Sequence, residues 1–130
     1  MSGGLLELEI VTPDGIALQA RGVETVVIHR RERSFDVGSE IAIYPRHAAM
    51  LVRIPVAAAR YDREGATVHL ALGGGFVEVR EDHVVVVTPR FACVPADETD
   101  AAAAAWRICA RWRTEAAGTR EELVGLRPGR

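Results

Sequence analysis

The alternation of apolar and polar side chains along the first two thirds of the chain constrains its fold more than any other feature. The pattern starts at Leu6-Glu7-Leu8-Glu9-Ile10 and continues with a period of two to about Pro89. Successive side chains of a strand point to opposite faces of a sheet, so this period predicts strands with one buried side and one solvent-facing side.

Short turn-forming segments divide this region into many strands. Thr12-Pro13-Asp14-Gly15 is a turn, because Pro13 presets φ at its second position and Gly15 accepts a positive φ. The polar segments 62–65 and 80–83 separate further strands. We expect strands at residues 6–10, 16–18, 23–29, 41–43, 50–54, 56–61, 67–72, 76–79 and 84–88. Their close spacing predicts an antiparallel sandwich or barrel, with two small sheets packed face to face.

The pattern changes to that of a helix after Pro95. The segment 97–100 supplies capping and acidic side chains for a helix N-terminus. One apolar stripe then follows with helical spacing: Ala101, Ala104, Ala105, Ile108 and Trp112. We expect the tail to dock through Ala105, Ile108 and Trp112.

Gly118 stands where the first helix is expected to end. The segment 119–122 has the spacing of a capping box and predicts a second helix, which Pro128 limits to about two turns. The tail is therefore expected to be a helical hairpin with a short second arm. We divide the chain into a β-sandwich domain at residues 1–92 and a helical tail at residues 96–130.

The composition excludes several classes of function. The net charge is only −2 and aromatic residues make up 5%, which argues against a nucleic-acid-binding surface. All 16 basic residues are arginine, so Schiff-base and P-loop lysine chemistry are excluded. Cys93 and Cys109 have no CxxC spacing, and no nucleophile elbow, carboxylate pair or dinucleotide fingerprint occurs. We therefore predict no catalytic residue, no metal and no cofactor.

The chain carries no pattern typical of a secretory signal or a membrane span. Met1-Ser2-Gly3-Gly4 lacks a basic segment, and no apolar run approaches the roughly 18 residues that cross a bilayer. We expect a cytosolic protein, or one attached peripherally to a membrane-bound assembly without inserting into the membrane.

The glycine run and the histidines are interpreted as structural or recognition residues. Gly73, Gly74 and Gly75 lack the GK[ST] ending of a phosphate loop and are expected to permit a bulge, a positive φ or close approach of another backbone. His47 belongs to the turn-like segment Tyr44-Pro45-Arg46-His47, for which we expect an interface or packing role. The four histidines show no familiar ligand spacing: His29, His47, His69 and His83.

Four segments, taken in order, resemble the epsilon subunit of F-type ATP synthases. They are Leu8-Glu9-Ile10-Val11-Thr12-Pro13, the segment from Gly38 to Ala48 that contains Tyr44-Pro45-Arg46-His47, the segment 70–79 with its three glycines and Glu78-Val79, and the aliphatic run 84–87. The family has an opening strand, a GxxGIxPxHxPLL-like segment, a GG-[aliphatic]-x-EV strand, an aliphatic run and a helical hairpin. Residues from about 6 to 115 can be placed on that plan.

This resemblance implies a non-catalytic rotor subunit of the central stalk. It implies a ten-stranded β-sandwich that binds the gamma subunit and rests on the rotor c-ring, at the cytoplasmic side of a bacterial cell membrane. Glu40 would correspond to the contact with the ring, and Ile43, Tyr44, Pro45 and His47 would lie at or near the joint with gamma and the ring. The helical tail would restrain ATP hydrolysis by reaching toward the catalytic head and its beta subunit.

The chain also departs from the family pattern. Ala42 and Ala49 replace a glycine and a proline, and we expect residues 30–35 to form a lengthened loop. Ala103 stands where the nucleotide motif of the family has an arginine, so the resemblance does not imply ATP binding here. These departures fit a divergent epsilon subunit of an alternative, sodium-type ATPase operon, although the coupling ion stays open.

Two other classes remain as alternatives. The first is a stand-alone β-sandwich that binds a metal or a sugar through its histidines, which three converging ligand side chains would favour. The second is an adaptor that binds a helix of another protein. An exposed apolar patch on one face of the sandwich would favour the rotor subunit, because permanent interfaces bury large apolar areas.

Overall fold

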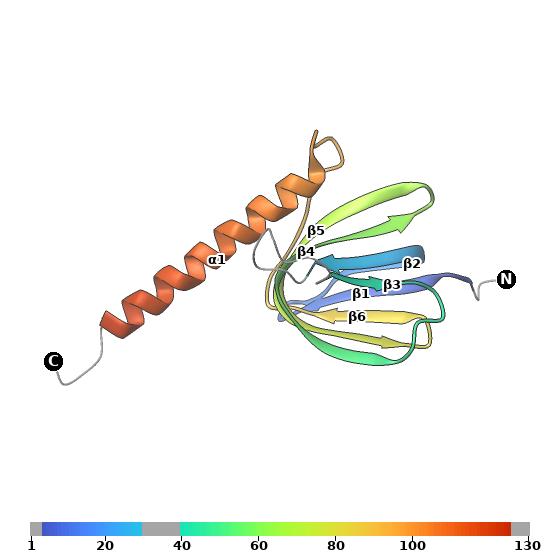
Figure 1. The fold of residues 1–130 in the computed structure, drawn as a ribbon, viewed down its shortest axis with the longest axis horizontal. Helices are drawn as coiled ribbons and strands as arrows, with labels where there is room; N and C mark the ends of the chain where they lie inside the picture. Colours follow the sequence, from blue (N-terminus) through green and yellow to red (C-terminus); the bar gives the residue numbers. More distant parts are fainter. Residues whose placement is uncertain (1–3, 30–39, 126–130) are drawn as a thin grey trace.

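The structure, a computed structural model, describes residues 4–29 and 40–125, with side chains up to residue 117. These residues form a β-rich body followed by one helix (Figure 1). The strands are β1 (Leu6–Thr12), β2 (Gly15–His29), β3 (Glu40–Ile43), β4 (Met50–Arg63), β5 (Ala66–Arg80), β6 (His83–Val87) and β7 (Phe91–Cys93), and the helix is α1 (Ala101–Gly125). The lengthened loop expected at residues 30–35 lies outside the described residues.

The strands pair in a ring rather than in two separate sheets. The order is β1-β6-β5-β4-β2-β3, and an additional pairing of β1 with β2 closes the ring. All pairs are antiparallel except β1 with β6, which run parallel. The expected β-rich domain with mostly antiparallel pairing is therefore present, whereas the described residues form seven strands instead of about ten.

The strand count differs because three pairs of expected strands are single long strands. Residues 16–18 and 23–29 join in β2, 50–54 and 56–61 in β4, and 67–72 and 76–79 in β5. In β4 and β5 the break in the pattern marks a bend, where Pro55 lies between the paired residues Ile54 and Val56 and faces Gly74. Proline cannot donate to the ladder and glycine packs no side chain, so the two strands bend together without ending.

The glycines at this bend allow a close approach that no other residue could make. Gly74 and Gly75 have φ values of 91° and 111°, and a Cβ on Gly75 would overlap the carbonyl oxygen of Val87 on β6. At Gly73 a Cβ would lie 2.7 Å from the Cβ of Arg90. The run therefore brings β5 against β6 and against the segment before β7.

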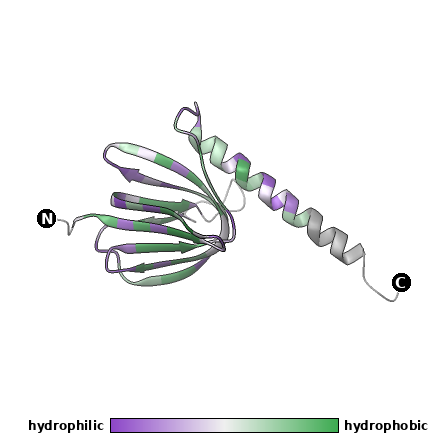
Figure 2. Ribbon diagram, turned by 180° about the vertical axis from the view of Figure 1, so that it is seen from behind, coloured by the Kyte–Doolittle hydropathy of each residue, from purple (hydrophilic) through white to green (hydrophobic). Residues whose placement is uncertain are grey.

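The inward side chains of the ring form the main core. Figure 2 shows the alternation of hydrophobic and hydrophilic residues along the strands that produces it. Its fully buried members include Leu6, Leu8, Ile10, Val23, Ile28, Ile43, Leu70, Leu72, Val77, Val79 and Val84. Burial of these aliphatic side chains, worth about 1.5–3 kcal/mol each, is the main driving force for the fold.

The helix begins where the sequence predicts and packs on the outside of the sheet. Asp100 is its N-cap, because the carboxylate accepts a hydrogen bond from the backbone N–H of Ala103 at 3.1 Å. A second apolar cluster joins the helix to β4, β5 and the segment after β7. Its buried members are Ala58, Ala71, Val94, Ala104, Ala105, Cys109 and Trp112, with Ile108 packed against them.

The prediction of a helical hairpin is wrong for the described backbone, which forms one helix where two were expected. The helix continues through Gly118 to Gly125 without a turn. A glycine in a helix interior costs only about 1 kcal/mol relative to alanine. The segment Arg120-Glu121-Glu122-Leu123 consists of good helix formers, so propagation past Gly118 outweighs that cost.

Candidate interaction surface

An exposed apolar row crosses five strands on the outer face of the sheet. Register pairs Arg53 with Phe76, Phe76 with Val87, Val87 with Val11, and Val11 with Ile16. Residues directly opposite each other on one face have adjacent side chains, so these five form a continuous line from β4 to β2, with four apolar residues and Arg53 at one end. We call it the apolar row.

Members of the apolar row are more exposed than large hydrophobic side chains usually are. Ile16 is 60% exposed, Val87 49% and Phe76 46%, while Leu51, diagonal to Phe76 on β4, is 70% exposed. The guanidinium of Arg53 covers part of the Phe76 ring, at 5.7 Å from its centroid. Single exposed hydrophobic residues are common, but a contiguous set marks a surface that binds another molecule.

The turn from Tyr44 to His47 presents recognition side chains at the end of β3. Tyr44 is 58% exposed, and Pro45 and His47 are half-buried. The turn is closed by a hydrogen bond from the His47 N–H to the Tyr44 carbonyl, and the His47 Nδ1 lies 2.7 Å from the Ala48 carbonyl oxygen. Ile43 is fully buried in the core, so it supports the turn and cannot itself contact a partner.

Glu40 lies at the start of β3 and is connected to the helix through His29. Its carboxylate lies 3.1 Å from His29 Nδ1, and Arg60 Nη1 lies 3.3 Å from His29 Nε2. Arginine can only donate, so His29 Nε2 accepts and the hydrogen on the ring is assigned to Nδ1, which donates to Glu40. The His29 ring also packs against Trp106, with centroids 5.8 Å apart. Glu40 is therefore linked through His29 to Trp106 of the helix.

Further contacts hold the helix on the sheet. The guanidinium of Arg90 lies over the Trp112 ring at 4.6 Å and pairs with Glu115 at 2.6 Å. Arg113 donates a hydrogen bond to the Val56 carbonyl oxygen at 2.6 Å. Burial raises the pKa of the Cys109 thiol, which lies on the buried side of the helix, so the thiol stays neutral at physiological pH.

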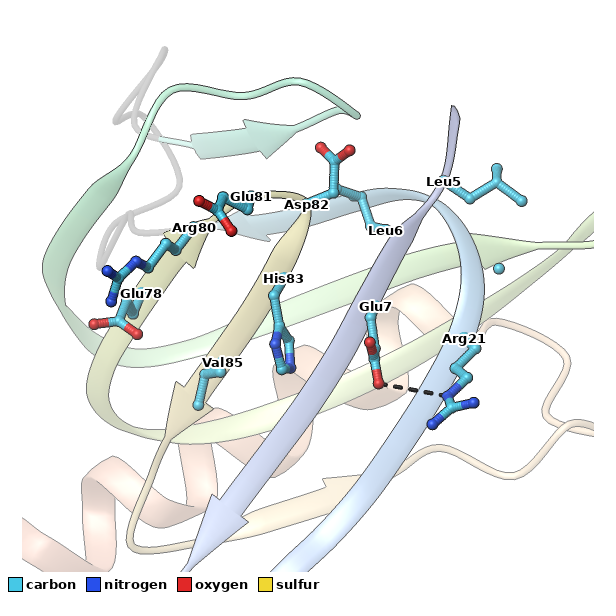
Figure 3. A pocket seen from close by; sticks show the side chains of 11 residues that line it. Leu5, Leu6, Glu7, Arg21, Glu78, Arg80, Glu81, Asp82, His83 and Val85 are labelled. Carbon is cyan, nitrogen blue, oxygen red and sulfur yellow. Dashed lines mark ion pairs between the residues drawn. The ribbon is translucent and has the colours of Figure 1, made fainter. Parts of the chain in front are cut away.

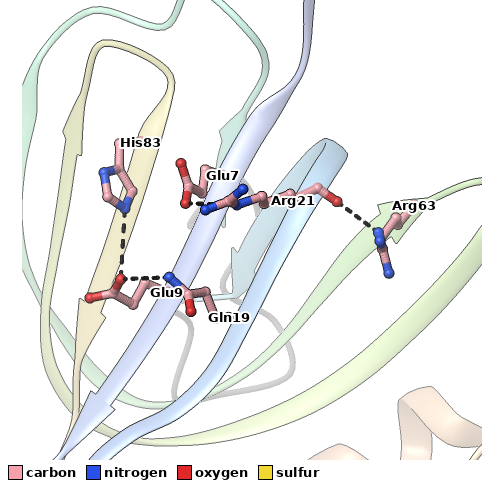
Figure 4. Close-up of polar contacts among 6 residues, drawn as sticks. All are labelled: Glu7, Glu9, Gln19, Arg21, Arg63 and His83. Carbon is pink, nitrogen blue, oxygen red and sulfur yellow. Dashed lines mark hydrogen bonds and ion pairs between the residues drawn. The ribbon is translucent and has the colours of Figure 1, made fainter. Parts of the chain in front are cut away.

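A polar face adjoins the apolar row at the start of β1 and β6. Arg21 pairs with Glu7 at 3.5 Å, and Gln19 donates to Glu9 at 3.5 Å, while His83 Nε2 lies 4.0 Å from Glu9 (Figure 4). A recess of about 800 Å³ opens beside these residues and is lined by charged groups of both signs, including Arg80 and Glu81 (Figure 3). Leu5, Leu6 and Val85 also line the recess, but it is open to solvent, whereas a small-molecule site encloses most of its ligand.

The observation that would favour a metal-binding sandwich is missing from the described part of the chain. Among the side chains described, at residues 4–29 and 40–117, no three of His, Cys, Asp or Glu gather as metal ligands do. Across the same residues, no helix is both long and apolar enough to span a membrane.

Sequence reasoning did not single out the apolar row. Its members lie on five different strands, and only the strand register brings them together. The alternation in each strand contained a signal, because Phe76 and Val87 are apolar at positions where the pattern demands an outward side chain. The bend at Gly73–Gly75 shifts that pattern and hides the signal.

A family comparison and a comparison with individual proteins both match this chain to ATP synthase subunits. Residues 5–92 match the family described as ATP synthase, Delta/Epsilon chain, beta-sandwich domain. The chain is 38% identical over 82 residues to the ATP synthase epsilon chain of Bacillus subtilis, which covers 63% of this chain and 57% of the relative. The epsilon chain of Alkalihalophilus pseudofirmus is 31% identical over 100 residues, or 77% of this chain and 70% of the relative. The Bacillus match thus spans little more than half the relative's length.

Solved structures share the fold. A chain in the central stalk and c-ring of Tetrahymena thermophila mitochondrial ATP synthase superposes with a TM-score of 0.56 at 17% identity, covering 89% of this chain and 93% of that one. A chain of the Euglena gracilis mitochondrial enzyme gives 0.60 at 16% identity, covering 75% and 58%. Taken with the match over residues 5–92, these findings show that the chain belongs to the delta/epsilon family of ATP synthase subunits, through the β-sandwich domain of that family.

Proposed function

We propose that this chain is a central-stalk rotor subunit of an F-type ATP synthase that couples proton or sodium translocation to ATP synthesis. Its work is mechanical, with no bond made or broken by its own residues. Family membership supports this role, and the Tetrahymena neighbour comes from a structure of the central stalk and c-ring. The subunit would be peripheral, at the cytoplasmic side of the membrane.

The observation that carries the proposal is the exposed apolar row. A permanent partner must bury a large and fairly apolar surface, and five adjacent strands supply one here. In the proposal this row binds the gamma subunit. The turn at Tyr44, Pro45 and His47, together with Glu40, would lie at the joint with gamma and the c-ring.

Co-purification with the gamma subunit from the same genome tests this proposal. Phe76→Arg places a second positive charge beside Arg53 in the apolar row and should weaken binding at least tenfold, because an unpaired charge would be desolvated in the interface. The matched control is Glu24→Ala, an exposed residue of β2 outside the row, which should leave affinity unchanged. Wild-type protein that does not bind gamma would overturn the rotor proposal and favour an adaptor for another helical protein.

The role of the helix needs a separate measurement. The assembled catalytic head, with and without residues 97–130, would be assayed for ATP hydrolysis. Faster hydrolysis without the tail would assign the helix an inhibitory role, through contact with the beta subunit. Equal rates would assign the chain a purely structural role, and the helix would then serve to cover the sheet.

A further inference from the structure

Two residues with left-handed backbone conformations face each other at one end of the sandwich. Arg46, in the turn after β3, has a φ of 68°, and Asp82, between β5 and β6, has a φ of 63°. The backbone N–H of Arg46 donates to Asp82 Oδ1 at 2.6 Å, across 36 residues of sequence. A left-handed arginine is disfavoured, so a specific contact must offset that cost.

Asp82 itself is held firmly by the strands around it. It is the second residue of a two-residue hairpin turn, since Arg80 pairs with His83, and a positive φ matches the twist of such turns. Its carbonyl oxygen accepts a hydrogen bond from Glu7 at 2.9 Å, which ties the turn to the start of β1. Figure 3 shows Asp82 at the tip of this hairpin beside β1.

The contrast between the two turns indicates which one orders the other. The Glu81-Asp82 turn is bounded by two residues in register and tied to a third strand. The connection between Ile43 and Met50 is longer, and four of its six residues are exposed. The Asp82 carboxylate on the shorter turn therefore fixes the longer turn that contains Arg46. A hydrogen bond of this length to a charged acceptor is stronger than one between neutral groups.

We propose that Asp82 is a positioning residue that holds the turn from Tyr44 to His47 in the conformation a partner recognises. It would raise affinity by reducing the conformational freedom that binding must remove, without contacting the partner itself. The partner assignment rests on the proposed function, whereas the hold on the turn is a property of the free chain.

Amide hydrogen exchange of the free full-length protein tests the hold on the turn. Asp82→Ala should speed exchange of the Arg46 amide about tenfold, since its acceptor is lost. Asp82→Asn keeps an oxygen acceptor and tolerates a positive φ, so it should retain part of the protection. Glu81→Ala alters the same turn without touching Arg46 and is the control. Unchanged exchange at Arg46 in Asp82→Ala would overturn the proposal.

Affinity for the purified gamma subunit and c-ring tests the consequence. Asp82→Ala should weaken binding about tenfold, with partial recovery in Asp82→Asn and no loss in Glu81→Ala. Adding Arg46→Gly to Asp82→Ala should not recover affinity, because glycine relieves the strain of a positive φ but leaves the turn more freedom for binding to remove. Recovery would show that relief of strain, and not a fixed turn, sets the affinity, and would overturn the positioning role. Faster exchange with unchanged affinity would overturn the positioning role. Wild-type protein that binds neither partner would overturn the proposed function and the positioning role, while exchange still decides whether Asp82 holds the turn.

Discussion

The outer surface of the sheet has two regions that differ in what covers them. On one side of the bend at Pro55 and Gly74, Ala58, Ala71 and Ala92 lie in register across β4, β5 and β7, and the helix covers the first two of these strands. On the other side lies the uncovered apolar row with Phe76, Val87 and Ile16. Small side chains admit a helix at close range, whereas large ones project toward a partner from outside the chain.

The two regions are both apolar but differ in side-chain size, and this size determines how closely another element can approach each of them. The alanine surface is matched by alanines of the helix, so both backbones approach closely and little apolar area is buried per residue. The specificity of that contact comes from Trp112, Cys109 and the Arg90 contacts. The apolar row has the opposite character, with a large area and no covering element among the described residues.

The largest expected effect concerns the bend that separates the two regions. Gly75→Ala should destabilise the protein by about 3 kcal/mol or more, because it combines an unfavourable φ with overlap on the Val87 carbonyl. Gly65→Ala is the matched variant, since Gly65 also has a positive φ, 78°, but open space around it. It should cost about 1–2 kcal/mol. Denaturant unfolding measures both, and equal losses would show that the close approach contributes nothing.

The next effect concerns the alanine surface. Ala71→Leu should cost about 1–3 kcal/mol, because the larger side chain forces the helix away from the sheet. In a Cys93→Ser background, the reaction of Cys109 with a thiol reagent reports the helix position, since Cys109 is fully buried. We expect faster labelling in Ala71→Leu and no change in Ala102→Leu, on the exposed side of the helix. Slow labelling in both would mean that the contact tolerates bulk.

A smaller effect should appear at alkaline pH. Burial raises the pKa of Cys109 above its usual 9.0, so the folded state holds the thiol proton more tightly than the unfolded chain. The stability from the neutral thiol is complete below about pH 9 and is lost as pH rises through the raised pKa. Unfolding measured from pH 7 to pH 10.5 should show a shallower decline in Cys109→Ala. Cys93 and Tyr61, whose pKa values burial also raises, remain in both proteins and act as the internal control.

The smallest expected effect concerns the apolar row in the free protein. Leu51→Ser should change stability by less than about 0.5 kcal/mol, because the side chain is already 70% exposed. Thermal unfolding of the isolated chain would check this. A loss above 2 kcal/mol would show that Leu51 packs within this chain, and would remove it from the surface that we propose binds gamma.

Local sequence patterns predicted many of the strands and the start of the helix. They did not predict features that depend on contacts between residues far apart in the sequence. The alternation at residues 6–10 and the turn at Pro13-Asp14-Gly15 correspond to β1 and its connection to β2, and Asp100 begins the helix as expected. Strand β7 was not predicted, because its three residues are too few to show an alternating pattern. Gly118 was misleading, because glycine permits a helix end but does not require one.

The sequence predicted only the part of the candidate site that is formed by neighbouring residues. The turn at Tyr44 to His47 could be recognised from its residue types, and Tyr44 is exposed there. The bond between Arg46 and Asp82 joins residues 36 positions apart, and no local pattern encodes it. The apolar row likewise depends on register across five strands. Both features belong to the topology and require the folded chain.

The two bent strands give the molecule a mechanical property. Phe76 and Ala71 are five residues apart on β5, a separation of about 17 Å at most, and their partners Arg53 and Ala58 are equally close on β4. A load applied at the uncovered surface therefore reaches the helix-bearing surface along two hydrogen-bonded strands, with no interdomain hinge between them. Displacement of one surface would be transmitted to the other as strain in the same pair of strands.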